Sequence, residues 1–247
     1  MKQRIIAHRG HNTEAPEQTM TAFRMAIELG AEMIEADVQI SRDGVAVMMH
    51  DWSLERTTSG RGPVSGLDWA EIATLDAGRW FDPRFAGERV PRLDELFALA
   101  TETGIGLCLE AKGQTLEANL EVSRRIGEEI ARRGRLEVDV LASFDHEALR
   151  IAASENPGLR TAPDRLPEHG ESTAANLLAQ ARAIGAPIIQ HHFSDLRPEV
   201  AAEVQAAGVE IWAWPPTTPE EVEQAIASGA IGIMGDDVRN IAAALRR

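Results

Sequence analysis

Short apolar runs alternate with helix-length segments along almost the whole chain, and this alternation constrains the fold more than any other feature of the sequence. The runs predict β-strands, and the segments between them have helical periodicity. Strands that alternate with helices build a parallel sheet, and eight of them close into a (β/α)8 barrel, or TIM barrel. We therefore expect an α/β fold of the TIM-barrel type, with strands at 4–8, 33–39, 105–112, 138–144, 160–163, 187–192, 210–214 and 231–234.

One apolar run breaks this alternation. Residues 45–50 are strand-like, but only Ser41-Arg42-Asp43-Gly44 separates them from the second strand. A parallel return needs about a dozen residues or more, whereas Asp-Gly is a strong hairpin turn. We expect 45–50 to pair antiparallel with the second strand, with position 50 opposite position 35. This hairpin would begin an insertion that covers approximately residues 40–90.

Length and composition fit a single domain. The chain has 247 residues without a long linker or a low-complexity tract, so we expect one TIM-barrel domain over 1–247. Its single cysteine, Cys108, excludes an internal disulfide and a cysteine-rich zinc module. A net charge of −14 argues against nucleic-acid binding. A polar start and the lack of a long apolar stretch predict a cytoplasmic protein without stable membrane insertion, and leave a homo-oligomer open.

The second and third barrel strands carry acidic residues near their carboxyl ends. Strand alternation turns Glu35 and Asp37 to one face, and Glu110 follows the apolar body of the next barrel strand. Adjacent strands lie about 4.8 Å apart, so the three carboxylates can converge. Oxygen ligands favour a hard divalent cation, Mg²⁺ or Ca²⁺. Two other interpretations stay open: a polar strand face in water, and a salt-bridge network closed by Arg9 and Lys112.

Two histidines are expected near these acids. His8 ends the first strand, and the hairpin would bring His50 opposite Glu35. The reference pKa of histidine suits proton transfer near neutral pH. Two histidines, three carboxylates, an arginine and a lysine at one barrel mouth indicate a metal-assisted phosphodiester hydrolase. A structural role is the alternative for either histidine taken alone.

An ordered set of short motifs resembles the glycerophosphodiester phosphodiesterase family, in its cytoplasmic bacterial form. The resemblance is dense from residue 4 to about 145 and thin onward to Asp236. Each motif alone is weak, but their order is specific. The motifs include His8-Arg9-Gly10, Pro16-Glu17-Gln18-Thr19, Gly30-Ala31, Glu35-Ala36-Asp37-Val38, Asp43-Gly44, His50-Asp51, Arg56-Thr57-Thr58-Ser59-Gly60-Arg61-Gly62, Glu110-Ala111-Lys112 and Ser143-Phe144.

The resemblance implies a TIM barrel with a small insertion after the second strand. It also implies an enzyme that uses one divalent cation, Mg²⁺ or Ca²⁺. The implied reaction cleaves a small-molecule glycerophosphodiester to sn-glycerol 3-phosphate and an alcohol. Matched position by position, the acid–base pair is His8 and His50, the metal ligands are Glu35, Asp37 and Glu110, and the phosphate contacts are Arg9 and Lys112.

Three departures from the family pattern are expected at the rim of the site, where Glu17 and Trp214 are candidate residues. Gln18 stands where the family usually has asparagine, Trp212-Ala213-Trp214-Pro215 replaces Trp-Thr-Val-Asn, and Gly235-Asp236 replaces Thr-Asp. We expect these departures to affect headgroup choice without touching the metal or histidine positions. A lysophospholipase D-like activity and a catalytically silent barrel that binds a phosphorylated ligand are the alternative functions.

Overall fold

The strands form a nearly closed barrel. The structure, a computed structural model, describes residues 2–246, so the two end residues of the expected 1–247 domain lie outside the described residues. Within 2–246, eight parallel strands are paired in the order β6-β5-β4-β2-β1-β9-β8-β7, and a bridge between Asp164 and Gln190 joins β6 to β7. The expected TIM barrel is confirmed. The strands are β1 (Arg4–Ala7), β2 (Met33–Ile40), β4 (Gly106–Ala111), β5 (Val140–Ser143), β6 (Arg160–Pro163), β7 (Ile188–His192), β8 (Glu210–Trp214) and β9 (Gly232–Gly235).

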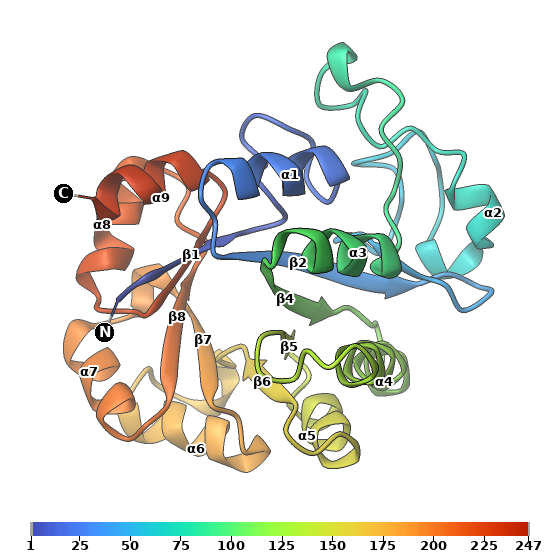
Figure 1. The fold of residues 1–247 in the computed structure, drawn as a ribbon. Helices are drawn as coiled ribbons and strands as arrows, with labels where there is room; N and C mark the ends of the chain where they lie inside the picture. Colours follow the sequence, from blue (N-terminus) through green and yellow to red (C-terminus); the bar gives the residue numbers. More distant parts are fainter. Residues whose placement is uncertain (1, 247) are drawn as a thin grey trace.

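Helices surround these strands (Figure 1). Local signals define their ends, as in α8, where the Thr218 hydroxyl accepts the Glu221 N–H at 3.2 Å and the Glu221 carboxylate accepts the Thr218 N–H at 3.1 Å. Across residues 2–246, no helix is both long enough and apolar enough to span a bilayer. The helices of the barrel layer are α1 (Met20–Glu28), α3 (Leu93–Thr103), α4 (Leu116–Arg132), α5 (His146–Glu155), α6 (Ala174–Ile184), α7 (Pro198–Ala206), α8 (Pro219–Ala227) and α9 (Val238–Leu245).

Two apolar layers hold the barrel together. The larger layer lies between the strands and the helices and includes Ile34, Ala36 and Val38 on the outward side of β2. The smaller layer fills the barrel interior, where Trp212 and Cys108 are fully buried. The polar residues between the outward positions of β2 therefore point into the barrel, above this inner layer.

The hairpin after β2 is present, but its register differs by one residue from the expectation. Strand β3 (Ala46–Met48) pairs antiparallel with β2, and Met48 lies opposite Val38, so His50 does not lie opposite Glu35. The reason is the turn, in which the Ser41 N–H bonds to the Val45 carbonyl at 2.9 Å and leaves a three-residue loop. Gly44 in this loop has a φ of +84°, which is the left-handed position that such loops require.

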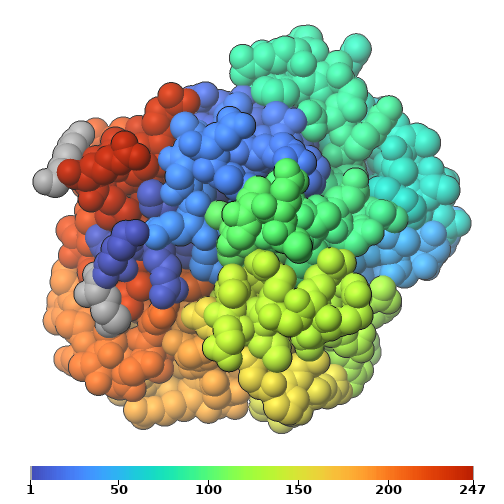
Figure 2. All heavy atoms as spheres, in the orientation of Figure 1, coloured from blue at the N-terminus to red at the C-terminus, as the bar shows by residue number. Residues whose placement is uncertain are grey.

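The insertion after β3 has a small core of its own, which includes Met49, Leu54 and Val64. It contains α2 (Trp69–Ile72) and the short 3-10 helices η1 (Val64–Gly66) and η2 (Pro83–Phe85). The remaining short 3-10 helices, η3 (Pro167–His169) and η4 (Phe193–Asp195), follow β6 and β7. Figure 2 shows the insertion, coloured from cyan to green, as a lobe at one side of the molecule. Because this core holds the chain after β3, it also fixes where His50 lies.

Candidate active site

Three carboxylates converge at the carboxyl ends of two neighbouring strands. Glu35 and Asp37 come from β2, and the parallel register places Glu110 of β4 beside Asp37. One oxygen from each of the three lies within 4.8 Å of the others. Glu35 and Asp37 are buried. The convergence expected from strand alternation is therefore present.

Two basic side chains approach the same carboxylates. The Lys112 Nζ lies 2.6 Å from a Glu110 oxygen and 3.2 Å from an Asp37 oxygen, and the Arg9 Nε lies 3.2 Å from the other Asp37 oxygen. Burial alone would raise the pKa of Asp37, but the charges of Lys112 and Arg9 outweigh it and keep that pKa below its usual value. The salt-bridge network considered as an alternative is thus also present, centred on Asp37.

Within the described part of the chain, only one of the two Glu35 carboxylate oxygens has a hydrogen-bond partner. Its Oε2 accepts the backbone N–H of Arg9 at 2.9 Å, while its Oε1 is buried without a hydrogen-bond partner among residues 2–246. Burial, followed by the charges of Asp37 and Glu110, raises the pKa of Glu35 well above its usual value. An orphaned buried oxygen beside two other carboxylates fits a hard divalent cation, which would supply the missing positive charge.

The loop before α1 reaches the carboxylates through Gln18, contrary to the expectation that this departure would not touch the metal position. Gln18 is buried, and its side-chain amide donates a hydrogen bond to Asp37 at 2.7 Å. Its backbone N–H bonds to the Arg9 carbonyl at 3.1 Å, and both residues have a positive φ. The loop therefore accommodates the Gln18 side chain, which is longer than the asparagine usual in the family, and the Gln18 amide orients Asp37.

The departure at Asp236 also reaches the site, contrary to the expectation, because Asp236 contacts a proposed catalytic histidine. The His8 Nδ1 lies 2.7 Å from an Asp236 oxygen, and the Asn12 side chain donates to the same oxygen at 2.8 Å. Donation from Nδ1 fixes the tautomer and leaves Nε2 free. That Nε2 faces the site, 4.0 Å from a Glu35 oxygen.

His50 has a matching arrangement. Its Nδ1 lies 2.7 Å from Asp51, which forms a bidentate ion pair with Arg56 at 2.6 and 2.9 Å. Arg56 also binds Glu17, which contacts Arg9 at 3.2 Å. Burial, with the charges of Arg9 and Lys112, lowers the pKa of His50 and favours its neutral form. The side chain of Glu17, a candidate for the rim, is only 12% exposed and forms ion pairs with both Arg9 and Arg56.

The sequence predicted His50 as a residue of the site but assigned no role to Asp51 or Arg56. The available signal was their spacing, since Asp51 follows His50 directly and Arg56 stands five positions later. The partner of His8 had no such local signal, because Asp236 lies 228 positions away.

A cavity of about 170 Å³ lies among these groups. Its lining includes His8, Arg9, His50 and Lys112, and also Trp214, the other candidate for the rim. Asp164 and Gln190, which sequence reasoning missed, also line it. Burial raises the pKa of Asp164 well above its usual value, and the nearby charge of Glu110 adds to the rise.

Comparison with known proteins identifies the family. The model of the glycerophosphoryl diester phosphodiesterase family matches residues 8–240. The chain belongs to this family. It is accordingly an enzyme of the phosphoric diester hydrolase class.

Relatives in the family match over their full lengths. A glycerophosphodiester phosphodiesterase from Caldanaerobacter subterraneus is 33% identical over 248 residues, which cover 100% of this chain and 99% of the relative. A glycerophosphodiester phosphodiesterase structure from Agrobacterium tumefaciens is 30% identical, with a TM-score of 0.81 over 98% of this chain and 100% of that one. A phosphodiesterase from Oleispira antarctica, determined in complex with the product sn-glycerol-3-phosphate, is 26% identical, with a TM-score of 0.89 over 100% and 98% of the two chains.

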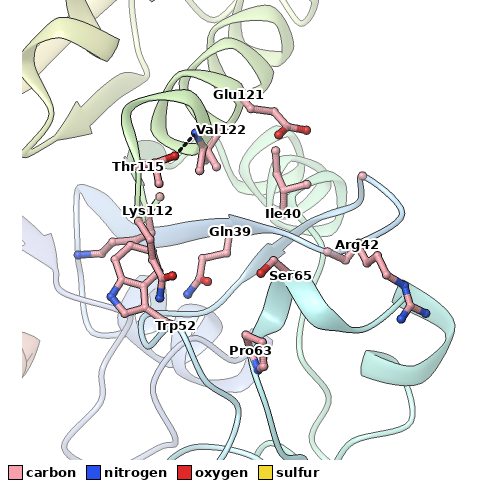
Figure 3. Close-up of a pocket in the computed structure, with 15 residues that line it drawn as sticks. Gln39, Ile40, Arg42, Trp52, Pro63, Ser65, Lys112, Thr115, Glu121 and Val122 are labelled. Atoms are coloured by element: carbon pink, nitrogen blue, oxygen red, sulfur yellow. Dashed lines mark hydrogen bonds between the residues drawn. The ribbon is translucent and has the colours of Figure 1, made fainter.

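In this family member, a second hollow of about 390 Å³ adjoins the site (Figure 3). It lies between the hairpin, the insertion and the start of α4, and its lining includes Gln39, Trp52 and Thr115. Lys112 borders both this hollow and the smaller cavity. Lys112 is therefore flanked by two spaces, one small and one larger.

Proposed function

We propose that this enzyme hydrolyses glycerophosphodiesters to sn-glycerol 3-phosphate and an alcohol, with one divalent cation, Mg²⁺ or Ca²⁺, held by Glu35, Asp37 and Glu110. The observation that carries the proposal is one cavity bordered by Glu110 of the carboxylate cluster and by two histidines, each paired with an aspartate. The Oleispira relative with bound sn-glycerol-3-phosphate supports the product.

The carboxylate cluster suits a hard cation. Oxygen ligands favour Mg²⁺ and Ca²⁺ over softer metals. When bound, such a cation would offset the negative charge of the phosphodiester and polarise its phosphorus–oxygen bonds. The orphaned Glu35 Oε1 supports this fit, because among the described residues 2–246 that oxygen has no hydrogen-bond partner.

Arg9 and Lys112 would hold the phosphate. Both line the small cavity, and both side chains are mostly buried. Burial would lower the pKa of Lys112, but the charges of Asp37 and Glu110 dominate and raise it, so the ammonium stays charged. A fixed positive charge in a water-poor site stabilises the added charge of a pentavalent phosphoryl group.

His8 and His50 would move the protons. During hydrolysis, an oxygen–phosphorus bond forms from water while the bond from phosphorus to the alcohol oxygen breaks. One histidine Nε2 accepts the proton that water loses, and the other donates a proton to the departing alcohol oxygen. Asp236 and Asp51 hold the two rings so that each Nε2 faces the cavity.

A product assay tests this function. The purified protein is incubated with glycerophosphocholine and Mg²⁺, Ca²⁺ or EDTA, and sn-glycerol 3-phosphate and choline are quantified. We expect both products with a divalent cation and neither with EDTA. Glu35→Gln should reduce activity strongly, whereas Trp80→Phe in the insertion should not. Cleavage of lysophosphatidylcholine alone would favour the lysophospholipase D-like alternative, and no cleavage of either would favour the silent barrel.

A further inference from the structure

Asp164 and Trp214 line the active-site cavity at the ends of β6 and β8, which are not the strands that carry the carboxylate cluster. Asp164 follows β6, and its backbone N–H bonds to the Ser143 carbonyl at 3.2 Å. Trp214 is the last residue of β8. Both line the 170 Å³ cavity together with His8 and Lys112. Neither has a role in the hydrolysis described above.

Each of these residues has a buried polar atom outside hydrogen-bonding geometry, and the Trp214 indole lies close enough to the Asp164 carboxyl to counteract part of the rise in its pKa. The Asp164 Oδ2 and the Trp214 Nε1 have no hydrogen-bond partner anywhere in the described chain, 2–246. Asp164 is only 2% exposed. A buried donor or acceptor left unpaired destabilises a protein, so such atoms normally have a ligand or a water as partner. Here an acceptor and a donor share one cavity beside the phosphate site.

The indole is also held in place. The Trp214 ring packs edge-on against Phe144, with centroids 5.8 Å apart, and against His192 at 5.4 Å. These two neighbouring rings restrict the rotation of the Trp214 side chain. The orientation of its indole N–H is therefore fixed before a ligand binds. Groups fixed in this way lose little entropy on binding.

A hydroxyl group matches this pair, because a hydroxyl both donates and accepts hydrogen bonds. The anionic part of the substrate has other partners, since under the proposed function Arg9 and Lys112 hold the phosphate. The space at Asp164 therefore suits a neutral, hydroxyl-bearing part of the substrate.

We propose that Asp164 and Trp214 form a subsite that binds the hydroxyl groups of the glycerol arm, which rests on the proposed function. The glycerol arm is the same in every glycerophosphodiester and suits a small cavity of about 170 Å³. The alcohol arm varies and suits the larger hollow of about 390 Å³ beyond Lys112. Asp164 and Trp214 would then determine that the diester carries glycerol.

The test compares two diesters. Glycerophosphocholine has free hydroxyls in its glycerol arm alone, and bis(p-nitrophenyl) phosphate has none. For Trp214→Phe, which keeps the ring and removes the N–H, we expect kcat/KM for glycerophosphocholine to fall about threefold to tenfold. For Asp164→Leu we expect a fall of about tenfold or more, with Asp164→Asn between it and the wild type. Activity on the aryl diester should change by less than about twofold. Trp80→Phe removes an indole N–H outside the cavity and is the matched control.

Binding gives a second measurement. Calorimetric titration of the Mg²⁺-loaded protein with sn-glycerol 3-phosphate and with inorganic phosphate should show that Asp164→Leu and Trp214→Phe weaken the first ligand and not the second. An equal loss on both ligands, or on both diesters, would show a merely structural role and overturn the subsite. Unchanged values for folded variants would overturn it as well.

The two proposals fail separately. A wild-type protein that leaves glycerophosphocholine intact refutes the proposed function, and the titration then still decides the subsite. A wild-type protein that cleaves glycerophosphocholine while the Asp164 and Trp214 variants match it refutes the subsite alone. Because Asp164→Asn and Trp214→Phe preserve shape, their melting temperatures should confirm that the comparison is made on folded protein.

Discussion

At the scale of single residues, the two proposed acid–base histidines share one design. In each, an aspartate oxygen lies 2.7 Å from Nδ1 and leaves Nε2 for the substrate. The supports differ in kind. Asn12 donates to Asp236, whereas Asp51 is held by the charged Arg56. The pKa of Asp51 is held well below its usual range, first by its bond to Arg56, so its negative charge persists under acidic conditions.

The first prediction concerns proton transfer. His8→Ala and His50→Ala should each lower kcat by about 10²–10⁴, with little change in KM, because a general acid or base acts in the transition state. The double variant should lose less than the product of the two single losses, since both serve one proton path. Steady-state kinetics on glycerophosphocholine measures this. A near-normal kcat for His50→Ala would make His50 a structural residue.

The second prediction concerns the positioning residues. Asp236→Asn and Asp51→Asn should each lower kcat by about 10- to 100-fold, because the amide no longer enforces the required tautomer. The KM and the melting temperature should stay near the wild-type values. Asp195→Asn, at a side chain that is 63% exposed, is the control and should leave kcat unchanged. A loss of stability that matches the loss of kcat would contradict a positioning role.

At the scale of secondary-structure elements, the hairpin and the insertion deliver His50 to the site. The β2–β3 pairing fixes the start of the inserted segment. Near the end of the insertion, the Pro91 carbonyl accepts the Met48 N–H at 2.9 Å. The Gln39 amide donates to the carbonyls of Met49 and Asp51 at 3.0 and 2.6 Å. The backbone around His50 is thus held by β2 itself.

The third prediction concerns the turn of this hairpin. Gly44 has a φ of +84°, and an added Cβ would meet no atom within 4 Å in the described residues, so the cost of substitution is conformational. Gly44→Ala should lower the free energy of unfolding by about 1–2 kcal/mol. Gly44→Asn should cost less, because asparagine tolerates the left-handed region. Urea unfolding checks the order, and equal costs for both variants would contradict it.

At the scale of the whole molecule, folding assembles a cluster of like charges that the unfolded chain does not have. Burial raises the pKa of Glu110, and it raises that of Glu35 well above its usual value. The ordinary value of both groups is 4.5. Above that pH, the unfolded chain loses these protons before the folded protein does. The contribution of Glu35 and Glu110 to stability without metal is therefore greatest below 4.5 and is lost as pH rises through their raised pKa values.

The fourth prediction follows from this sign. A divalent cation takes the place of the protons, so stabilisation by Mg²⁺ should increase as pH rises from about 5 to 8, reaching about 2.7 kcal/mol at 100 times Kd. Asp37 does not obscure the trend, since its lowered pKa affects stability only at more acidic pH. Thermal unfolding with Mg²⁺ or EDTA across this range measures it. Glu35→Gln should flatten the rise, and a pH-independent effect of Mg²⁺ would contradict carboxylate ligation.

Much of the fold was predictable from the sequence, because its signals are local. All eight barrel strands were expected, and 160–163 and 210–214 match their observed bounds. Strand alternation alone turned Glu35 and Asp37 to one face, and the short connection after β2 alone required an antiparallel return. These properties depend on side chains within a few residues of one another, so they can be inferred before the chain is folded.

Other features were decided only by the tertiary structure, because they depend on how distant strands meet at the barrel mouth. Closure of the barrel brings Asp236 to His8 across 228 positions and places Asp164 and Trp214 on one cavity. The geometry of the turn set the hairpin register one residue away from the expected pairing. The direction of a side chain at a strand end follows from strand stagger and neighbouring packing, and both of these arise only when the barrel closes.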